Sequence, residues 1–156
     1  MFEGQHYQNA YITPDIEAAI ASFAARAPIG DVRIFDIAQT LQLPSGAKKL
    51  ATRLAFIWID NLQYELIQVV EDETGVYSGY TSNGGIMHFH HICMRVSGDW
   101  DSFRARIAAQ NFPVVLERAI AGDELKYLYI DAREMCGHYI EYCWMTDARW
   151  DMMRAM

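Results

Sequence analysis

The sequence predicts an α+β protein in which two βαβββ modules form an open β-cup, followed by a short C-terminal helix. Three observations carry this prediction: a β-α-β-β-β order of patterns in the first half, the same order after a polar loop, and a final amphipathic segment. A length of 156 residues with 52% hydrophobic residues suffices for a buried core. We expect a first module at residues 1–75, a linker at 76–86, a second module at 87–146 and the helix at 147–156.

The first module opens with a strand and a helix. Tyr7–Thr13 is typical of a strand, and the pair Pro14-Asp15 ends that strand and begins a helix. The apolar positions of this helix recur at helical spacing: Ile16, Ala19, Ile20 and Phe23. A βα unit is therefore predicted up to about residue 27.

Three β-rich segments complete the first module. An extended segment is expected around Val32–Ile37, before a polar stretch that contains Pro44. Two further β-rich runs follow at Thr52–Ile59 and Leu62–Val70. Asp60-Asn61 between these runs favours a tight hairpin turn.

The same order of elements begins again after a polar, glycine-containing loop. The predicted elements are a strand at His88–Val96, a helix at Trp100–Gln110, β-rich segments at Val114–Ile120 and Leu125–Ile130 around the turn Ala121-Gly122-Asp123, and a last strand at His138–Met145. Thr146–Met156 is expected to form the closing helix, with Thr146 or Asp147 as its N-cap. A duplication of this kind predicts a ligand in the cleft between two curved sheets.

Composition and charge exclude several classes of protein. A net charge of −7 repels a phosphate backbone, so we expect no nucleic-acid partner. The apolar runs are too short to span a bilayer, and the N-terminus lacks a basic, apolar signal segment. We therefore expect a soluble cytoplasmic protein without a membrane partner. Three cysteines without CxxC spacing imply no disulfide framework.

Four stretches carry a resemblance to a known family. Tyr11–Ala19 is similar to the strand-to-helix opening of a glyoxalase-type module, and Gly84–Val96 to the second-module opening of methylmalonyl-CoA epimerases, with its glycine pair and His-His-Ile-Cys strand. Tyr64–Ile67 and Gly137–Tyr142 are similar to the last strands of the two modules. Over roughly residues 7–145, the chain resembles the vicinal-oxygen-chelate superfamily (glyoxalase, bleomycin resistance and extradiol dioxygenase), nearest to glyoxalase I and methylmalonyl-CoA epimerase.

The resemblance implies a metal site. In that superfamily, the first and last strands of each module supply side chains that hold one metal ion. Carried over by position, the first-strand ligands are Gln8 and His91, and the last-strand ligands are Glu65 and Glu141. The implied cofactor is a divalent metal ion: Zn, Mn, Co, Ni or Fe(II).

Strand alternation supports the two carboxylates independently. Glu65 shares a strand face with Ile67, and Glu141 shares one with Tyr139 and Cys143. Burying an ionised carboxylate without a counter-charge costs several kcal/mol or more. A divalent cation between two inward-facing acids removes that cost.

Each of these residues also has a purely structural interpretation. His91 could be a core histidine, and Glu141 a solvent-facing acid. Glu65 would face solvent if the register slipped by one residue, and Gln8 could be an ordinary polar surface residue. With the same slip, His90 would replace its neighbour as the ligand.

A metal site of this composition predicts enolisation chemistry. The ion polarises a carbonyl or chelates two vicinal oxygens, while Glu65 or Glu141 removes the adjacent proton. Glutathione-dependent glyoxalase has an arginine where this chain has Ile12, and CoA-thioester epimerases have an acid near residues 44–49, where this chain has none. Many aromatic residues near the predicted cup favour a small, apolar or aromatic substrate.

Two other functions stay open. The chain could be a drug- or metabolite-binding protein of the bleomycin-resistance type, which performs no reaction. An extradiol-type dioxygenase is less consistent with the sequence, because Gln8 takes the place of one of its histidines. We also expect a homodimer, in which the Met- and Trp-rich C-terminal helix is either a contact surface or a lid over its own core.

Overall fold

The computed structural model describes residues 3–43, 45–79, 85–120 and 122–155. Pro44, Gly84, Ala121 and Met156, which the sequence analysis assigned to loops, motifs or the closing helix, lie outside the described residues.

The chain divides into two compact units, one of residues 8–91 and one of residues 1–7 and 92–156. The boundaries fall inside two strands, β1 (Gln5–Ile12) and β5 (His88–Val96), so that each strand belongs to both units. The module limits predicted from the sequence therefore stay a prediction.

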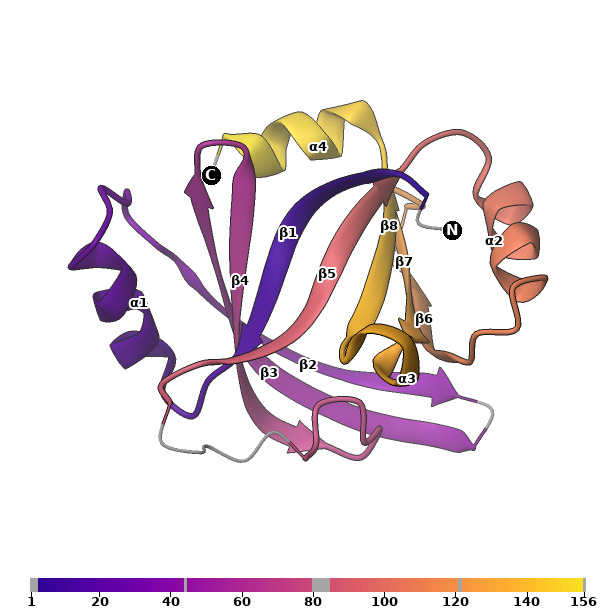
Figure 1. Cartoon of the computed structure of the whole chain (residues 1–156), viewed down its shortest axis with the longest axis horizontal. Helices are drawn as coiled ribbons and strands as arrows, with labels where there is room; N and C mark the ends of the chain where they lie inside the picture. Colours follow the sequence, from indigo (N-terminus) through magenta and orange to yellow (C-terminus); the bar gives the residue numbers. More distant parts are fainter. Residues whose placement is uncertain (1–2, 44, 80–84, 121, 156) are drawn as a thin grey trace. The chain divides into compact units, whose positions relative to one another are not determined.

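The unit of residues 8–91 contains the elements expected of the first module (Figure 1). After β1 come α1 (Ile16–Ala24), β2 (Ile34–Leu43), β3 (Gly46–Ile59) and β4 (Leu62–Asp72). The strand order is β2-β3-β4-β1-β5, in which β1 runs parallel to β4, while β3 is antiparallel to both β2 and β4.

Helix α1 covers one face of this part of the sheet. Asp15 caps the helix, because its side chain accepts a hydrogen bond of 2.9 Å from the backbone N–H of Ala18. The buried helix residues pack against alternate residues of β3 and β4, in a cluster of Ile16, Ala19, Ala55, Ile57 and Leu66. The residues between them on β3 and β4 must face away from α1.

The β2–β3 hairpin is longer than the sequence predicted. Strand β2 continues to Leu43, and β3 begins at Gly46 and not at Thr52. Gly46 has a φ of 105°, a conformation that a glycine adopts without strain, and Leu43 is its register partner. Residues 38–43 and 46–51, which were not predicted as strands, therefore form the end of a two-stranded ribbon.

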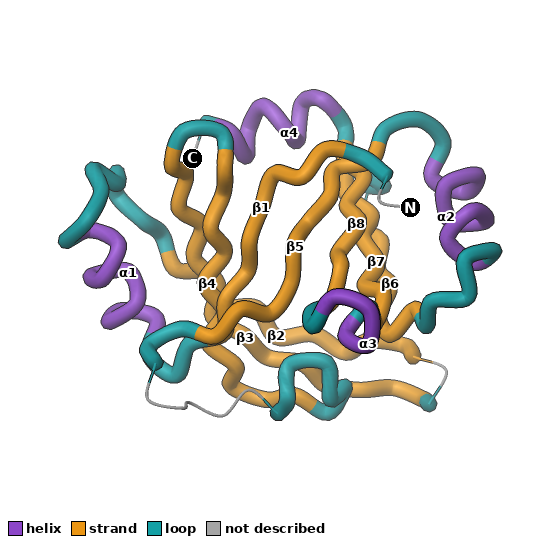
Figure 2. Tube along the Cα trace, in the orientation of Figure 1, coloured by secondary structure: helices purple, strands orange, loops and turns teal. Residues whose placement is uncertain are grey.

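The second unit contains the end of β5 and the elements that follow it (Figure 2). They are α2 (Trp100–Ala108), β6 (Val114–Ala119), β7 (Leu125–Asp131), α3 (Arg133–Cys136), β8 (Tyr139–Met145) and α4 (Asp147–Arg154). The strand order is β1-β5-β8-β7-β6. Asp99 caps α2 as Asp15 caps α1, and Thr146 is the N-cap of α4, as one of the two expected candidates. The short helix α3 was not predicted.

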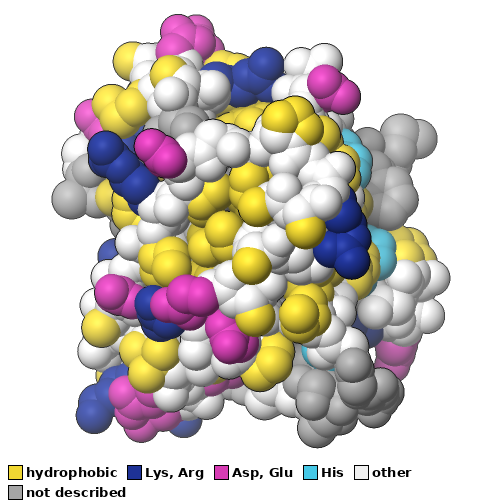
Figure 3. All heavy atoms as spheres, turned by 90° about the vertical axis from the view of Figure 1, so that its left-hand side faces the viewer, with side chains coloured by type: hydrophobic (Ala, Val, Ile, Leu, Met, Phe, Trp, Pro, Cys, Tyr) yellow, Lys and Arg dark blue, Asp and Glu magenta, His cyan; other side chains and the backbone are white. Residues whose placement is uncertain are grey.

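The prediction of two βαβββ modules followed by a C-terminal helix is confirmed. On the face that carries α1, apolar side chains remain visible between acidic and basic ones (Figure 3). Among the described residues, no helix has the length and apolar character needed to cross a membrane.

Candidate metal centre

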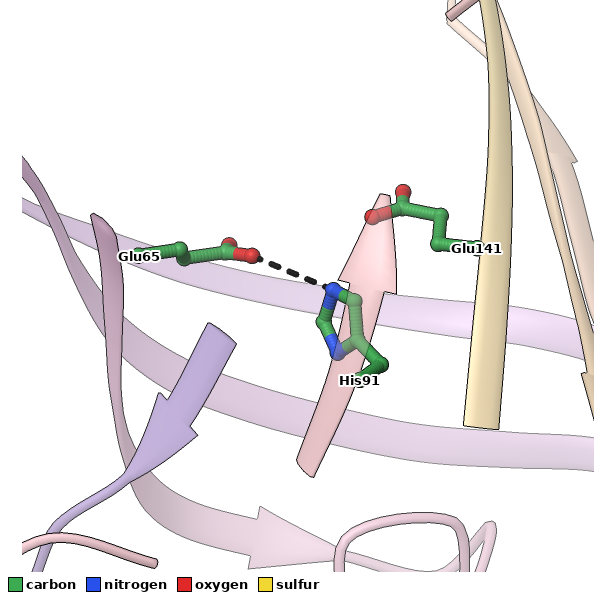
Figure 4. A group of neighbouring side chains, drawn as sticks. All are labelled: Glu65, His91 and Glu141. Atoms are coloured by element: carbon green, nitrogen blue, oxygen red, sulfur yellow. Dashed lines mark ion pairs between the residues drawn. The ribbon is translucent and has the colours of Figure 1, made fainter. Parts of the chain in front are cut away.

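Glu65 on β4 and His91 on β5 form a buried pair. A carboxylate oxygen of Glu65 lies 3.5 Å from Nε2 of His91, and the two side chains are 10% and 0% exposed. The register pairs Glu65 with Ala10 on β1 and with Phe56 on β3, on the sheet face opposite α1. In Figure 4, the Glu65 side chain points toward the imidazole of His91.

Gln8 and Gln63 lie on the same sheet face as Glu65. They are register partners across the parallel strands β1 and β4, two residues before Ala10 and Glu65. Both are buried, and Nε2 of Gln8 donates a hydrogen bond of 2.7 Å to Oε1 of Gln63. This contact uses the amide nitrogen of Gln8, and the amide oxygen is the atom with which a glutamine binds a cation.

A second imidazole stands behind His91. His90 Nδ1 lies 2.8 Å from His91 Nδ1, and His90 Nε2 lies 3.0 Å from the carbonyl oxygen of Val76. Both histidine side chains are fully buried. The ring of Tyr77 stacks on His90, with centroids 4.9 Å apart and an interplanar angle of 15°.

The loop after β4 places Val76 and Tyr77 beside His90. Asp72 organises this loop, because one of its carboxylate oxygens accepts hydrogen bonds from the backbone N–H groups of Thr74 and Gly75, at 2.8 and 3.1 Å. Its other oxygen accepts from the N–H of Tyr77 at 2.9 Å. One side chain thus sets the backbone path that brings a carbonyl and an aromatic ring to the second imidazole.

Glu141 belongs to the second unit, at the middle of β8. It is 9% exposed, and its register partner on β7 is Tyr129. Burial, together with the neighbouring groups of Cys143, Cys93 and Glu141, raises the pKa of the Tyr7 phenol well above its ordinary value. Burial likewise raises the pKa of the Cys93 thiol, so Tyr7 and Cys93 both stay protonated beside Glu141.

The sheet face around Glu65 is largely apolar on the β2–β3 ribbon, although the same register also places Gln39, Lys48 and Thr52 on it. By register and alternation, this face carries the partly exposed residues Phe35, Ile37, Leu54, Phe56 and Trp58. The rings of Phe35 and Phe56 are 6.1 Å apart. The charged residues Asp36 and Arg53 fall on the other face, where Arg53 also pairs with Glu17 of α1.

The donor set fits a divalent ion. Within the unit of residues 8–91, the carboxylate of Glu65 and the imidazole of His91 are buried side by side and offer an oxygen and a nitrogen ligand (Figure 4). Two ligand atoms about 2.1 Å from one ion, at a tetrahedral angle, lie about 3.4 Å apart. The 3.5 Å between Glu65 and His91 matches that spacing. Oxygen and imidazole ligands suit zinc and the other divalent metals expected from the sequence.

The comparison with protein families decides the family. The model described as the Glyoxalase/Bleomycin resistance protein/Dioxygenase superfamily matches residues 7–129. The chain belongs to this superfamily. No curated protein matches the sequence.

Solved structures of the glyoxalase-type fold are similar over almost the whole chain. Methylmalonyl-CoA epimerase from Mycobacterium tuberculosis shares 16% identity with a TM-score of 0.65, and the match covers 97% of each chain. A hypothetical protein from Bacillus halodurans C-125 shares 13% identity with a TM-score of 0.58, over 92% of this chain and 95% of that one. Streptomyces coelicolor methylmalonyl-CoA epimerase in complex with 2-nitronate-propionyl-CoA shares 14% identity with a TM-score of 0.53, over 92% and 98%. At these identities the likeness shows the fold.

All four residues implied by the superfamily resemblance are buried on strands. Glu65 and Glu141 do not face solvent, and His91 is fully buried. His90, considered only as a substitute ligand, contacts His91 through the nitrogen remote from Glu65. Sequence reasoning missed Val76 in particular, because a backbone carbonyl leaves no side-chain pattern from which its contact could be inferred.

Proposed function

We propose that this protein is a glyoxalase-like metalloenzyme that removes a proton next to a carbonyl of a small, apolar metabolite, as an isomerase, epimerase or lyase. Gln8, Glu65, His91 and Glu141 are the proposed metal ligands. A divalent ion, when bound, supplies a Lewis acid that polarises a carbonyl or two vicinal oxygens. The names of two similar structures, both methylmalonyl-CoA epimerases, support the isomerase form of this proposal.

The buried pair of Glu65 and His91 is the observation that carries the proposal. A carboxylate with little solvent access is costly unless a positive charge lies next to it. The imidazole of His91 supplies that charge only if it is protonated, whereas a shared cation supplies it with His91 neutral. The 3.5 Å spacing suits two ligands of one ion.

The roles of the chain's own residues follow from their chemistry. Glu65 and Glu141 are the candidate bases, and the one that takes the substrate proton returns it to another carbon or to the opposite face. His91 and Gln8 are neutral ligands that hold position without accepting the proton. The apolar residues of the β2–β3 ribbon exclude water from this face, which favours charge stabilisation at the reacting carbonyl.

The apolar face also defines the proposed substrate. Phe35, Phe56 and Trp58 offer aromatic surface, while Asp36 and Arg53 are directed to the other face of the ribbon. Flat or apolar carbonyl compounds bury area against such a surface, and small highly charged acids do not. We therefore propose a compact aromatic or otherwise apolar carbonyl compound.

Metal analysis and isotope exchange test the proposed function together. Purified protein is expected to contain a stoichiometric divalent metal and to catalyse solvent-deuterium exchange into the α-position of an apolar ketone or thioester panel, followed by NMR. E65Q and E141Q are expected to lower the exchange rate by about 10²–10⁴-fold if the substituted acid is the base. E134Q, at an exposed acid of α3, is the matched control and is expected to exchange like the wild type.

A binding protein without turnover is the second candidate, and the apolar ribbon face favours it. Such a protein would bind members of the panel without metal and release them undeuterated. That result would overturn the proposed enzyme. Exchange that needs the metal and either Glu65 or Glu141 would exclude the binding protein.

A further inference from the structure

We propose that His90 is a positioning residue, which fixes the tautomer and the ring orientation of His91 so that His91 presents the lone pair of Nε2 to the metal. The inference rests on the proposed function, because it concerns how the chain prepares one ligand of that site. It assigns a role to His90, Val76 and Asp72, none of which is a proposed ligand.

The direction of the hydrogen bonds follows from Val76. A carbonyl oxygen only accepts, so the Nε2 of His90, 3.0 Å away, carries a proton and donates it. A neutral imidazole has one N–H, which makes Nδ1 of His90 an acceptor. The Nδ1 of His91, 2.8 Å from that acceptor, must therefore be the donor.

This series of hydrogen bonds places the lone pair of His91 on Nε2, where it can bind a metal. With its proton on Nδ1, neutral His91 has a lone pair on Nε2, the nitrogen that lies 3.5 Å from the Glu65 carboxylate. A lone pair and a carboxylate oxygen repel each other. A cation bound by both reverses that repulsion. The hydrogen-bond relay from His91 through His90 to Val76 therefore prepares Glu65 and His91 to bind an ion.

Packing holds the relay in this arrangement. The side chains of His90 and His91 have no solvent exposure, and Tyr77 covers the face of the His90 ring. Asp72 fixes the loop that carries Val76, through its bonds to Thr74, Gly75 and Tyr77. The ring of His91 therefore cannot turn without breaking a buried hydrogen bond.

A neutral support also suits the charge of the site. The two proposed carboxylate ligands, Glu65 and Glu141, would together balance the charge of one divalent ion. A carboxylate behind His91, a common support for metal-bound histidine, would add a third negative charge. An imidazole whose own N–H is bound to a carbonyl orients His91 equally well and leaves the charge balanced.

The test combines a direct observation of the relay with two substitutions of its central residue. In the Zn²⁺-loaded, ¹⁵N-histidine-labelled wild type, NMR is expected to show scalar coupling between Nδ1 of His91 and Nδ1 of His90, across the hydrogen bond. His90→Phe keeps a ring beside Tyr77 without an acceptor, and is expected to raise the Kd for Zn²⁺ by about 10–100-fold. His90→Asn places an amide oxygen near the position of Nδ1, and is expected to restore most of the affinity. His138→Phe, at a histidine whose Nδ1 contacts the backbone oxygen of Tyr139, is the matched control and should bind Zn²⁺ like the wild type.

The possible results separate this inference from the proposed function. If the wild type binds no Zn²⁺, the metal centre and the relay both fail. If it binds Zn²⁺ without coupling between the two Nδ1 atoms, or if His90→Phe binds as tightly as the wild type, the relay alone is overturned. Equal weakening in His90→Phe and His90→Asn also overturns it, because packing would then explain both. The coupling is measured in the wild type and does not depend on how any variant folds.

Discussion

Gln8 donates a 2.7 Å hydrogen bond to the side-chain oxygen of Gln63, its direct register partner across the parallel strands β1 and β4. The bond engages the nitrogen end of the Gln8 amide, and the oxygen end is the one with which a glutamine binds a cation. It also links the proposed ligand Gln8 to Gln63, a residue that was not predicted from the sequence to belong to the site.

Replacing Gln63 tests this link. In Q63M, the buried amide N–H of Gln8 loses its acceptor, so we expect the free energy of unfolding to fall by about 1–3 kcal/mol. Zn²⁺ affinity should fall by about tenfold or more, as for other residues that orient a ligand. Q63E is the matched control, because its carboxylate still accepts from Gln8 and should keep the affinity. Calorimetric titration and urea denaturation measure both quantities, and Zn²⁺ binding by Q63M as tight as in the wild type would contradict the link.

Metal binding should stabilise the fold through Glu141. At a free Zn²⁺ concentration of 100 times Kd, we expect the wild type to gain about 2.7 kcal/mol in free energy of unfolding. E141Q should lose much of this gain, while its metal-free form should be at least as stable as the metal-free wild type, because a buried negative charge has been removed. Thermal unfolding with and without Zn²⁺ measures both effects. A Zn²⁺ shift of equal size in E141Q would argue against Glu141 as a ligand, and E134Q controls for the loss of an acid elsewhere.

The ion pair of Asp131 and Arg133 should make the free energy of unfolding depend on pH. The side-chain hydrogen bond from Arg133 holds the pKa of Asp131 below its ordinary value of 3.8. A lowered pKa means that the stabilisation is present above about pH 4 and is lost as the pH falls through the folded-state pKa. R133M should therefore be less stable than the wild type by about 0.2–1 kcal/mol at neutral pH, a range typical of exposed pairs. The difference should shrink toward zero in strong acid. Urea denaturation from pH 2 to 7 measures it, and a difference independent of pH would show that packing of Arg133 on Tyr139 is the cause.

The approach of the N-terminal strand to β5 depends on Gly4. Gly4 has a φ of 91°, and an added Cβ would overlap the carbonyl oxygen of Arg95. Gly98 has a similar φ of 83°, but a Cβ there would meet nothing within 4 Å. G98A should cost about 1–2 kcal/mol, the penalty for a left-handed conformation, and G4A should cost more because it adds the overlap. Equal losses of stability in the two variants would show that the strands can separate at this point.

Patterns that depend on residue type were visible in the sequence, and those that depend on backbone geometry were not. The strand His88–Val96 was predicted with its observed bounds, and Thr146 was one of two proposed caps for the last helix. The end of β2 and the start of β3 were missed, because exposed polar residues on a two-stranded ribbon resemble a loop. The four-residue helix α3 has too few residues to show a helical period.

The same distinction between residue type and backbone geometry applies to the candidate site. The four proposed ligands came from strand positions implied by the resemblance, and their burial agrees with an inward orientation. The contact of His90 with Val76 could not be anticipated, because it requires a loop bent by Asp72 so that a main-chain oxygen meets a side chain 14 positions further along. The sequence contains both Val76 and His90, but no pattern in it indicates that they lie close together.

Because β1 and β5 each cross the boundary between the two compact units, we expect that neither half of the chain folds by itself. A chain cut between the modules would produce one fragment that retains the opening strand and another that lacks it, although both compact units use residues of that strand. We expect such fragments to be recovered only when they are produced together. A single polypeptide therefore supplies each compact unit with its own residues of β1 and β5.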